Sequence, residues 1–249
     1  MEVRWLGHST VLLELDGVRV LTDPLLRRRV AHLRRSSPAP TDTAVDAVLI
    51  SHGHHDHLDL PSLRKLPRSV PVVVPRGLGQ LVGKQGFADV REVLEGDELE
   101  VSGLRLRVSH AEHDERRAGS RARAAPVGYA LLGSSRVFFA GDTDVFPGLE
   151  GIVSELDLAL VPIWGWGASL GTGHLDPARA ADAVALLRPR VVVPIHWGTF
   201  RPLHHRSRAP FLRDPVDEFV AAARERAPEV EVRVLEPGES LKLQPCSTP

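Results

Sequence analysis

The stretch Ala47-Val48-Leu49-Ile50-Ser51-His52-Gly53-His54-His55-Asp56-His57 places four histidines and one aspartate directly after four apolar residues. The apolar run is typical of a buried strand, and imidazole nitrogen and carboxylate oxygen suit Zn, Mn or Fe. Surface tracts and tags rich in histidine are normally terminal and flanked by polar linkers, whereas this stretch is internal. The stretch therefore predicts a metal site at the end of a buried strand.

The spacing of the ligand types favours two metal ions over one. In an extended turn, His52 and His54 point the same way and can reach one ion, while Asp56 and His57 lie further along and can reach a second. Paired ions can clamp both the attacking oxygen and the oxygen of the reacting group, which ester and phosphodiester hydrolysis require. A binuclear site needs further ligands, and we expect them at the ends of other strands.

Three later segments each run from an apolar strand into a possible ligand. The predicted strands cover residues 105–109, 136–140 and 190–195, and they are followed by His110-Ala111-Glu112-His113, Gly141-Asp142-Thr143 and His196-Trp197-Gly198. A set of strand ends that all deliver His or Asp is a stronger signal than any single motif. The chain therefore carries a constellation of candidate ligands.

These motifs resemble the metallo-β-lactamase-fold hydrolases, in the branch that contains N-acylphosphatidylethanolamine phospholipase D and the L-ascorbate 6-phosphate lactonase-like proteins. The matching residues extend over nearly the whole chain, at 5–14, 21–24, 51–59, 113, 141–143, 161–163, 173–177 and 194–200. The resemblance implies an α+β fold, a four-layer αββα sandwich. It also implies that one ion is held by His52, His54 and His113, that the other is held by Asp56, His57 and His196, and that Asp142 bridges them.

The third ligand of the first trio has a competitor in His110. In the phospholipase-like branch the third metal-binding histidine is usually followed by Trp and Ser. Here His113 is followed by Asp114-Glu115-Arg116-Arg117, so a phospholipid substrate is not implied. The alanine two positions before His113 matches the family context and favours His113 over His110. The expected cofactors are two divalent metal ions, zinc first, with manganese or iron as alternatives.

The predicted function is hydrolysis of a small lactone or other carboxylic ester by a metal-bridging hydroxide, with a phosphodiester as second choice. Asp56 would ligate an ion and orient the nucleophile, and His174 would protonate the leaving group or else be a plain loop histidine. Asp23, after a predicted strand at 18–22, would accept the N–H of a ligand histidine or else be a turn residue before Pro24. The opposing class is a non-catalytic metal-binding or sensing protein.

Length and composition fit one enzyme domain. A chain of 249 residues with 43% hydrophobic content can bury a large core, and we expect one domain over 1–249 with a flexible tail at about 244–249. The net charge of −1 argues against a nucleic acid partner. The lone Cys246 cannot form an internal disulfide, and no apolar stretch has transmembrane length. We expect a soluble cytoplasmic protein that acts on a small molecule, with homo-oligomerisation left open.

Several other features carry weaker predictions. The helices are expected at residues 60–66, 78–85, 149–155, 177–187 and 215–226, with Asp176 as the N-cap of the fourth, and residues 27–42 are expected to form an irregular loop. An arginine-rich loop at 116–123 would suit a phosphate, although 28 Arg against 3 Lys in the chain make compositional bias the simpler explanation. The tryptophans and the remaining histidines are left open as cleft or structural residues: Trp164, Trp166, Trp197, His8, His32, His55, His204 and His205.

Overall fold

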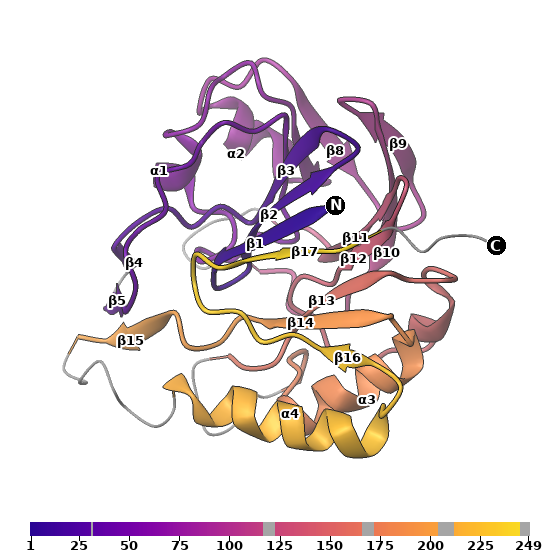
Figure 1. Cartoon of the computed structure of the whole chain (residues 1–249). Helices are drawn as coiled ribbons and strands as arrows, with labels where there is room; N and C mark the ends of the chain where they lie inside the picture. Colours follow the sequence, from indigo (N-terminus) through magenta and orange to yellow (C-terminus); the bar gives the residue numbers. More distant parts are fainter. Residues whose placement is uncertain (31, 117–122, 166–171, 204–211, 245–249) are drawn as a thin grey trace.

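The computed structural model describes residues 1–30, 32–116, 123–165, 172–203 and 212–244, and within them two seven-stranded sheets lie face to face (Figure 1). The first sheet has the order β17-β1-β2-β3-β6-β7-β8 and the second the order β16-β14-β13-β12-β11-β10-β9. The first sheet consists of β1 (Glu2–Gly7), β2 (Thr10–Leu15), β3 (Val18–Thr22), β6 (Ala47–Leu49), β7 (Val72–Pro75), β8 (Val90–Val93) and β17 (Ser240–Lys242). The second consists of β9 (Glu98–Val101), β10 (Leu104–His110), β11 (Val127–Leu132), β12 (Arg136–Phe139), β13 (Leu158–Pro162), β14 (Val191–Ile195) and β16 (Glu231–Val232).

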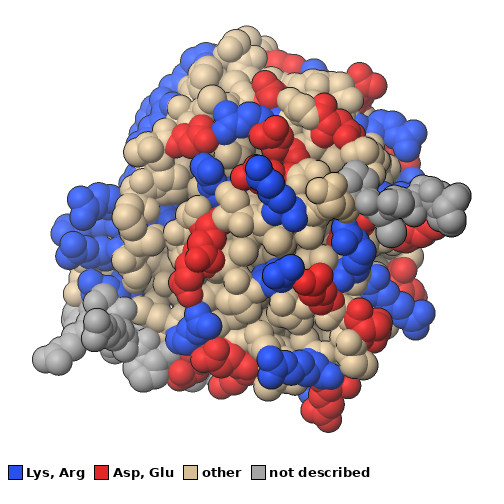
Figure 2. Space-filling view, in the orientation of Figure 1, with Lys and Arg blue, Asp and Glu red and all other residues tan. Residues whose placement is uncertain are grey.

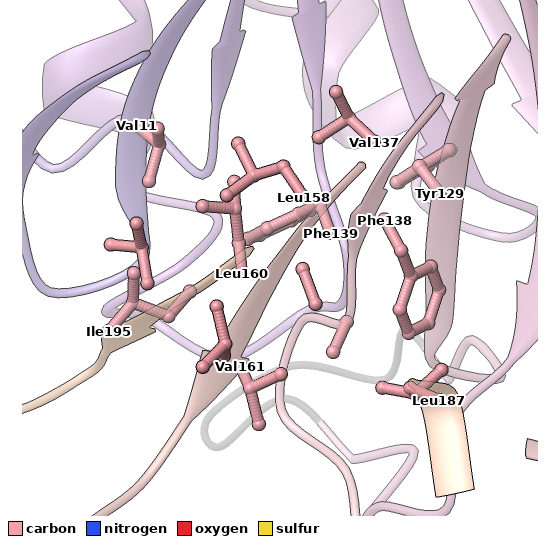
Figure 3. Close-up of a cluster of buried hydrophobic side chains, with 14 of the residues drawn as sticks. Val11, Tyr129, Val137, Phe138, Phe139, Leu158, Leu160, Val161, Leu187 and Ile195 are labelled. Atoms are coloured by element: carbon pink, nitrogen blue, oxygen red, sulfur yellow. The ribbon is translucent and has the colours of Figure 1, made fainter. Parts of the chain in front are cut away.

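The main core lies between the two sheets. Val11 of β2 and Leu160 of β13 belong to one cluster of buried side chains, together with Tyr129 and Phe139 (Figure 3). Burying one such side chain stabilises the fold by about 1.5–3 kcal/mol relative to leaving it in water. Successive side chains of a strand point to opposite faces of its sheet. Val48 in β6 therefore packs on the outer face of the first sheet, whereas its two neighbours in the sequence pack in the main core.

Helices cover the outer face of each sheet. Leu63 of α1 (Leu60–Leu63) and Val82 of α2 (Gly79–Gly83) pack with Val48 in a second buried cluster. The second sheet is covered by α3 (Pro177–Leu187) and α4 (Asp214–Arg226), which lie side by side along the bottom of the view in Figure 1. The expected αββα layering is therefore confirmed.

The bounds of the two longer helices were predicted well. The helix α3 has the predicted bounds, and the Asp176 side chain accepts a hydrogen bond from the backbone N–H of Arg179 at 2.8 Å. The helix α4 begins one residue before the predicted start. Three predictions are wrong in length: α1 and α2 are single turns, and residues 149–155 contain only the 3-10 helix η1 (Leu149–Gly151). Gly148 and Gly151 lie at this segment, and glycine disfavours helix by about 1 kcal/mol.

The expectation of an irregular loop at 27–42 is wrong in part. This segment forms β4 (Arg29–Val30) and β5 (Leu33–Arg35), which pair with β15 (Phe200–Pro202) in a three-stranded sheet. Val30 and Phe200 are buried on one face of it, and this burial fixes the hairpin. None of the described helices has the length and apolar character to cross a bilayer. Cys246 lies outside the described residues.

Candidate metal centre

The structure brings the seven sequence-predicted ligands together at one edge of the sandwich. The strands β12, β13 and β14 are parallel, so Asp142 after β12 and His196 after β14 emerge at the same edge. Residues 52–57 follow β6 in the opposing sheet. Two groups result, each with ligand atoms within 4.8 Å of one another: His52, His54 and His113 in the first group, and His8, Asp56, His57 and His196 in the second.

The first group is oriented by its hydrogen bonds. His113 Nδ1 lies 2.6 Å from the carbonyl oxygen of Gly173, so Nδ1 carries the hydrogen and Nε2 faces the group, 3.0 Å from His54 Nδ1. Gly173 has φ +83°, and a Cβ atom there would lie 3.1 Å from His113 Cα. Glycine at this position therefore allows the loop to reach His113.

The second group is oriented in the same way. His196 Nδ1 donates to the Trp164 carbonyl oxygen at 2.5 Å, and His57 Nδ1 donates to Asp23 Oδ2 at 2.7 Å. Their Nε2 atoms lie 3.3 Å apart, and each is 3.3 Å from Asp142 Oδ2. Asp142 also forms a group within 4.8 Å with His113 and His174. It is therefore the residue that links the two groups.

Asp23 supports a histidine in each group. Its buried carboxylate accepts hydrogen bonds from the Ser51 N–H at 2.7 Å, the Ser51 hydroxyl at 2.6 Å and His57 Nδ1. Because the single hydroxyl hydrogen of Ser51 goes to Asp23, Ser51 Oγ accepts from His52 Nδ1 at 2.9 Å. The Nε2 atoms of His52 and His57 are thus both turned towards the centre. Gly141 leaves room for Ser51, since a Cβ atom at 141 would lie 2.6 Å from Ser51 Cβ.

The donor set fits divalent cations. Among the described residues, the buried atoms that lack a hydrogen-bond partner include His52 Nε2, Asp142 Oδ1 and His174 Nδ1. A buried polar atom without a partner is costly, and three of them at one place indicate a ligand. Imidazole nitrogens combined with carboxylate oxygens are the ligands of zinc, manganese and iron sites.

Burial and charge set the protonation of these groups. Burial lowers the pKa of His52, His54 and His113, so their lone pairs are available at neutral pH. Burial also lowers the pKa of His57, but the carboxylates of Asp142 and Asp56 outweigh this effect and raise it well above the usual value. A bound cation would take the place of the proton on His57, because it would supply the positive charge next to these carboxylates.

The sequence left His8 outside the confident candidates, and the structure places it in the second group. His8 is 1% exposed, and its Nε2 lies 3.0 Å from Asp56 Oδ2. Its backbone N–H donates to Thr199 Oγ1 at 2.7 Å, and its carbonyl oxygen accepts from Trp5 Nε1 at 2.8 Å. The only sequence signal for this residue was the motif Trp5-Leu6-Gly7-His8-Ser9 of the resemblance.

Other candidates lie outside the two groups. His110 is held between Glu95 at 3.1 Å and Glu112 at 3.3 Å, and it contacts neither group. Trp197 is 3% exposed and stacks on Trp5, so it belongs to the packing rather than to a pocket wall. Two other open candidates, His32 and His55, are exposed in the structure. The remaining ones lie outside the described residues: Trp166, His204, His205 and positions 117–122 of the arginine-rich loop.

Comparisons with known proteins agree with this geometry. A family model described as the beta-lactamase superfamily domain matches residues 18–197. A UPF0173 metal-dependent hydrolase of Methanopyrus kandleri is 34% identical over 96% of this chain and 99% of its own. An uncharacterized protein of Mycobacterium tuberculosis is 35% identical over 90% of this chain, which spans 64% of that protein. The solved structure of Igni18, a metallo hydrolase from Ignicoccus hospitalis, has a TM-score of 0.71 and 25% identity and covers 98% of this chain and 99% of its own. The metallo-β-lactamase fold is therefore confirmed.

Proposed function

Because the chain belongs to the beta-lactamase superfamily domain family and is a metal-dependent hydrolase, we propose that it binds two divalent ions and hydrolyses a small lactone or other carboxylic ester. One observation carries the two-ion proposal. Asp142 Oδ2 lies 3.3 Å from the Nε2 atoms of His57 and His196, while its buried Oδ1 has no hydrogen-bond partner among the described residues. The same carboxylate forms a group within 4.8 Å with His113 of the first group, and a carboxylate close to both groups suits a bridge between two ions.

The ligand assignment follows from the two groups. His52, His54 and His113 would hold one ion, and Asp56, His57 and His196 would hold the other, with Asp142 shared. Zinc is the proposed metal, with manganese or iron as alternatives that the same donors accept. When bound, the two ions would supply Lewis-acid activation of water and of the substrate oxygen.

The chain's own residues would orient the reactants and move the protons. Asp56 is fixed through its bond to His8 Nε2, and a carboxylate held in this way can orient an attacking water. His174 lies beside His113, with ring centroids 4.5 Å apart, and its Nδ1 has no hydrogen-bond partner among the described residues. We assign to His174 Nδ1 the donation of a proton to the leaving alcohol.

Metal analysis of the purified chain tests the two-ion proposal. After reconstitution with zinc or manganese, we expect about two ions per chain, as a binuclear hydrolase requires. Asp142→Ala should lower this number, whereas Asp144→Ala is the matched control, because the Asp144 carboxylate pairs with Arg179 instead. A folded protein that retains one ion or fewer contradicts the proposal.

A substrate panel tests the reaction class. The metal-loaded chain should hydrolyse lactones or carboxylic esters faster than phosphodiesters. Turnover of phosphodiesters alone would contradict the ester proposal and identify the chain as a phosphodiesterase, which is the alternative function. A chain that binds two ions and turns over none of these classes would be a metal-binding or sensing protein instead.

A further inference from the structure

The outer face of the three-stranded sheet carries a row of arginines. The register pairs Arg29 of β4 with Arg34 of β5, and Arg34 with Arg201 of β15, so the three side chains lie on one face. The opposite face carries Val30 and Phe200, which are 7% and 1% exposed and pack in a small core. We call Arg29, Arg34 and Arg201 the arginine row.

This arrangement opposes a general rule of sheet stability. Like charges directly opposite one another in an antiparallel pair destabilise it. Within the described part of the chain, neither Arg29 nor Arg34 forms a side-chain hydrogen bond or ion pair, and both are exposed, as is the adjacent Arg28. Some exposed arginines elsewhere pair with a carboxylate, as Arg107 does with Glu98, whereas others, such as Arg105, have no such partner among the described residues, so the like-charge register is what distinguishes the arginine row. Arg29 and Arg34 thus break a local rule without a compensating contact among the described residues, which indicates a function, and the partner that these two side chains lack is an anion.

The charge is a local feature of the molecule. The net charge of the whole chain is −1, so the arginine row is not the result of a generally basic surface. Figure 2 shows Lys and Arg side chains gathered at the left edge of the view, where β4 and β5 lie in Figure 1. An anionic partner would therefore meet this edge first.

An exposed leucine beside the arginine row points to the kind of partner. Leu203 follows β15 directly and is 49% exposed, the highest value among the large hydrophobic residues that the structure describes as exposed. Its N–H donates to the His32 carbonyl oxygen at 3.2 Å, which places it at the turn between β4 and β5. Basic side chains around an exposed apolar one suit an acidic lipid surface, because the cations pair with headgroups while the apolar side chain enters the interface.

Nucleic acid fits this face less well. Proteins that bind single strands stack the bases on exposed aromatic rings, and the aromatic residue of this sheet, Phe200, is buried on the inner face. We propose that the outer face of the three-stranded sheet binds membranes that contain acidic phospholipids. This property is separate from the proposed hydrolysis. The two regions are nonetheless neighbours, because the Phe200 ring lies 5.8 Å from the His8 ring of the second group.

Vesicle binding tests the proposal. The purified full chain is sedimented at low salt with vesicles of phosphatidylcholine alone or mixed with phosphatidylglycerol. We expect binding only to the mixed vesicles and weaker binding as salt is added. The variant Arg29→Ser/Arg34→Ser should lower the partition coefficient by about tenfold or more. Leu203→Ser should also lower it, by a smaller factor.

The matched control removes the same charge elsewhere. Lys84→Ser/Arg105→Ser changes two exposed cations outside the three-stranded sheet and should bind like the unmodified chain. Thermal unfolding of each variant shows that it remains folded. Equal binding to both kinds of vesicle, binding to neither, or unchanged binding of Arg29→Ser/Arg34→Ser overturns the proposal. A short oligonucleotide that displaces the vesicles and depends on the same two arginines would assign the face to nucleic acid and also overturn it.

Discussion

Replacing Asp23 by asparagine should weaken the binding of both proposed metal ions. The Asp23 carboxylate is 0% exposed and accepts three hydrogen bonds, two from Ser51 and one from His57 Nδ1. Through Ser51 it also fixes His52. His57 and His52 belong to different groups, so a single carboxylate supports one histidine at each proposed ion.

The magnitude follows from the donors that asparagine cannot satisfy. Asparagine presents one oxygen and one amide NH₂ to three hydrogen donors, so at least one donor faces another donor. A hydrogen bond to a charged group contributes about 1.5–3 kcal/mol, and loss of the group behind a ligand histidine typically costs about 10–100-fold in metal affinity. We expect Asp23→Asn to reduce the affinity for each ion by about this factor.

Competition with a metal chelator measures both affinities in the same folded sample. Ser51→Ala should lower chiefly the affinity for the ion proposed at His52. This substitution removes the hydroxyl that accepts from His52 Nδ1, while the hydrogen bond between Asp23 and His57 remains. Asp59→Asn is the matched control: Asp59 is 3% exposed and also accepts from a serine N–H and hydroxyl, those of Ser62, but its carboxylate pairs with Arg27. Unchanged affinities in Asp23→Asn, or a loss confined to one ion, would refute the reasoning.

Three further substitutions test the roles of single residues at and near the centre. His113→Ala should lose metal and activity together, because His113 Nε2 lies 3.0 Å from His54 Nδ1, while His110→Ala should keep the metal content, since His110 is held by Glu95 and Glu112. Elemental analysis and turnover measured on the same preparations decide this, and the reverse result would make His110 the ligand. Asp56→Asn should lower kcat by about a hundredfold or more and affect substrate binding less, because the charge that is proposed to orient the attacking water would be lost. Near-normal kcat in this variant would exclude Asp56 from the chemistry.

The sequence predicted the elements whose signals are local. The apolar run before Ser51 corresponds to β6, and residues 18–22 form β3 with the predicted bounds. The helix α3 was predicted to the residue because Asp176 caps it and Pro177 occupies its first position. Residue types at strand ends identified the candidate ligands, because metal-binding side chains are uncommon directly after apolar strands.

The three-stranded sheet could not be predicted for a physical reason. Strands of two or three residues, such as β4 and β5, are too short to show the alternation that identifies a strand. The strand β15, which pairs with β5, lies far away in the sequence, so this pairing depends on the completed fold. The content of Arg, Ser and Pro in this segment suggested an irregular loop, whereas Val30 and Phe200 provide the buried contact that holds the sheet together.

The position of His8 depends on a backbone conformation that could not be predicted from the sequence. His8 has φ 58° and His196 has φ 64°, in the left-handed region that residues other than glycine seldom adopt, at a cost of about 1–3 kcal/mol each. The His196 N–H donates to the His8 carbonyl oxygen at 3.0 Å, and the two rings contact each other with centroids 3.9 Å apart and an interplanar angle of 39°. Each strained residue therefore holds the other, and together they aim His8 Nε2 at Asp56. Strain of this kind clusters at functional sites, and we therefore interpret His8 as a residue that positions Asp56 in the proposed centre.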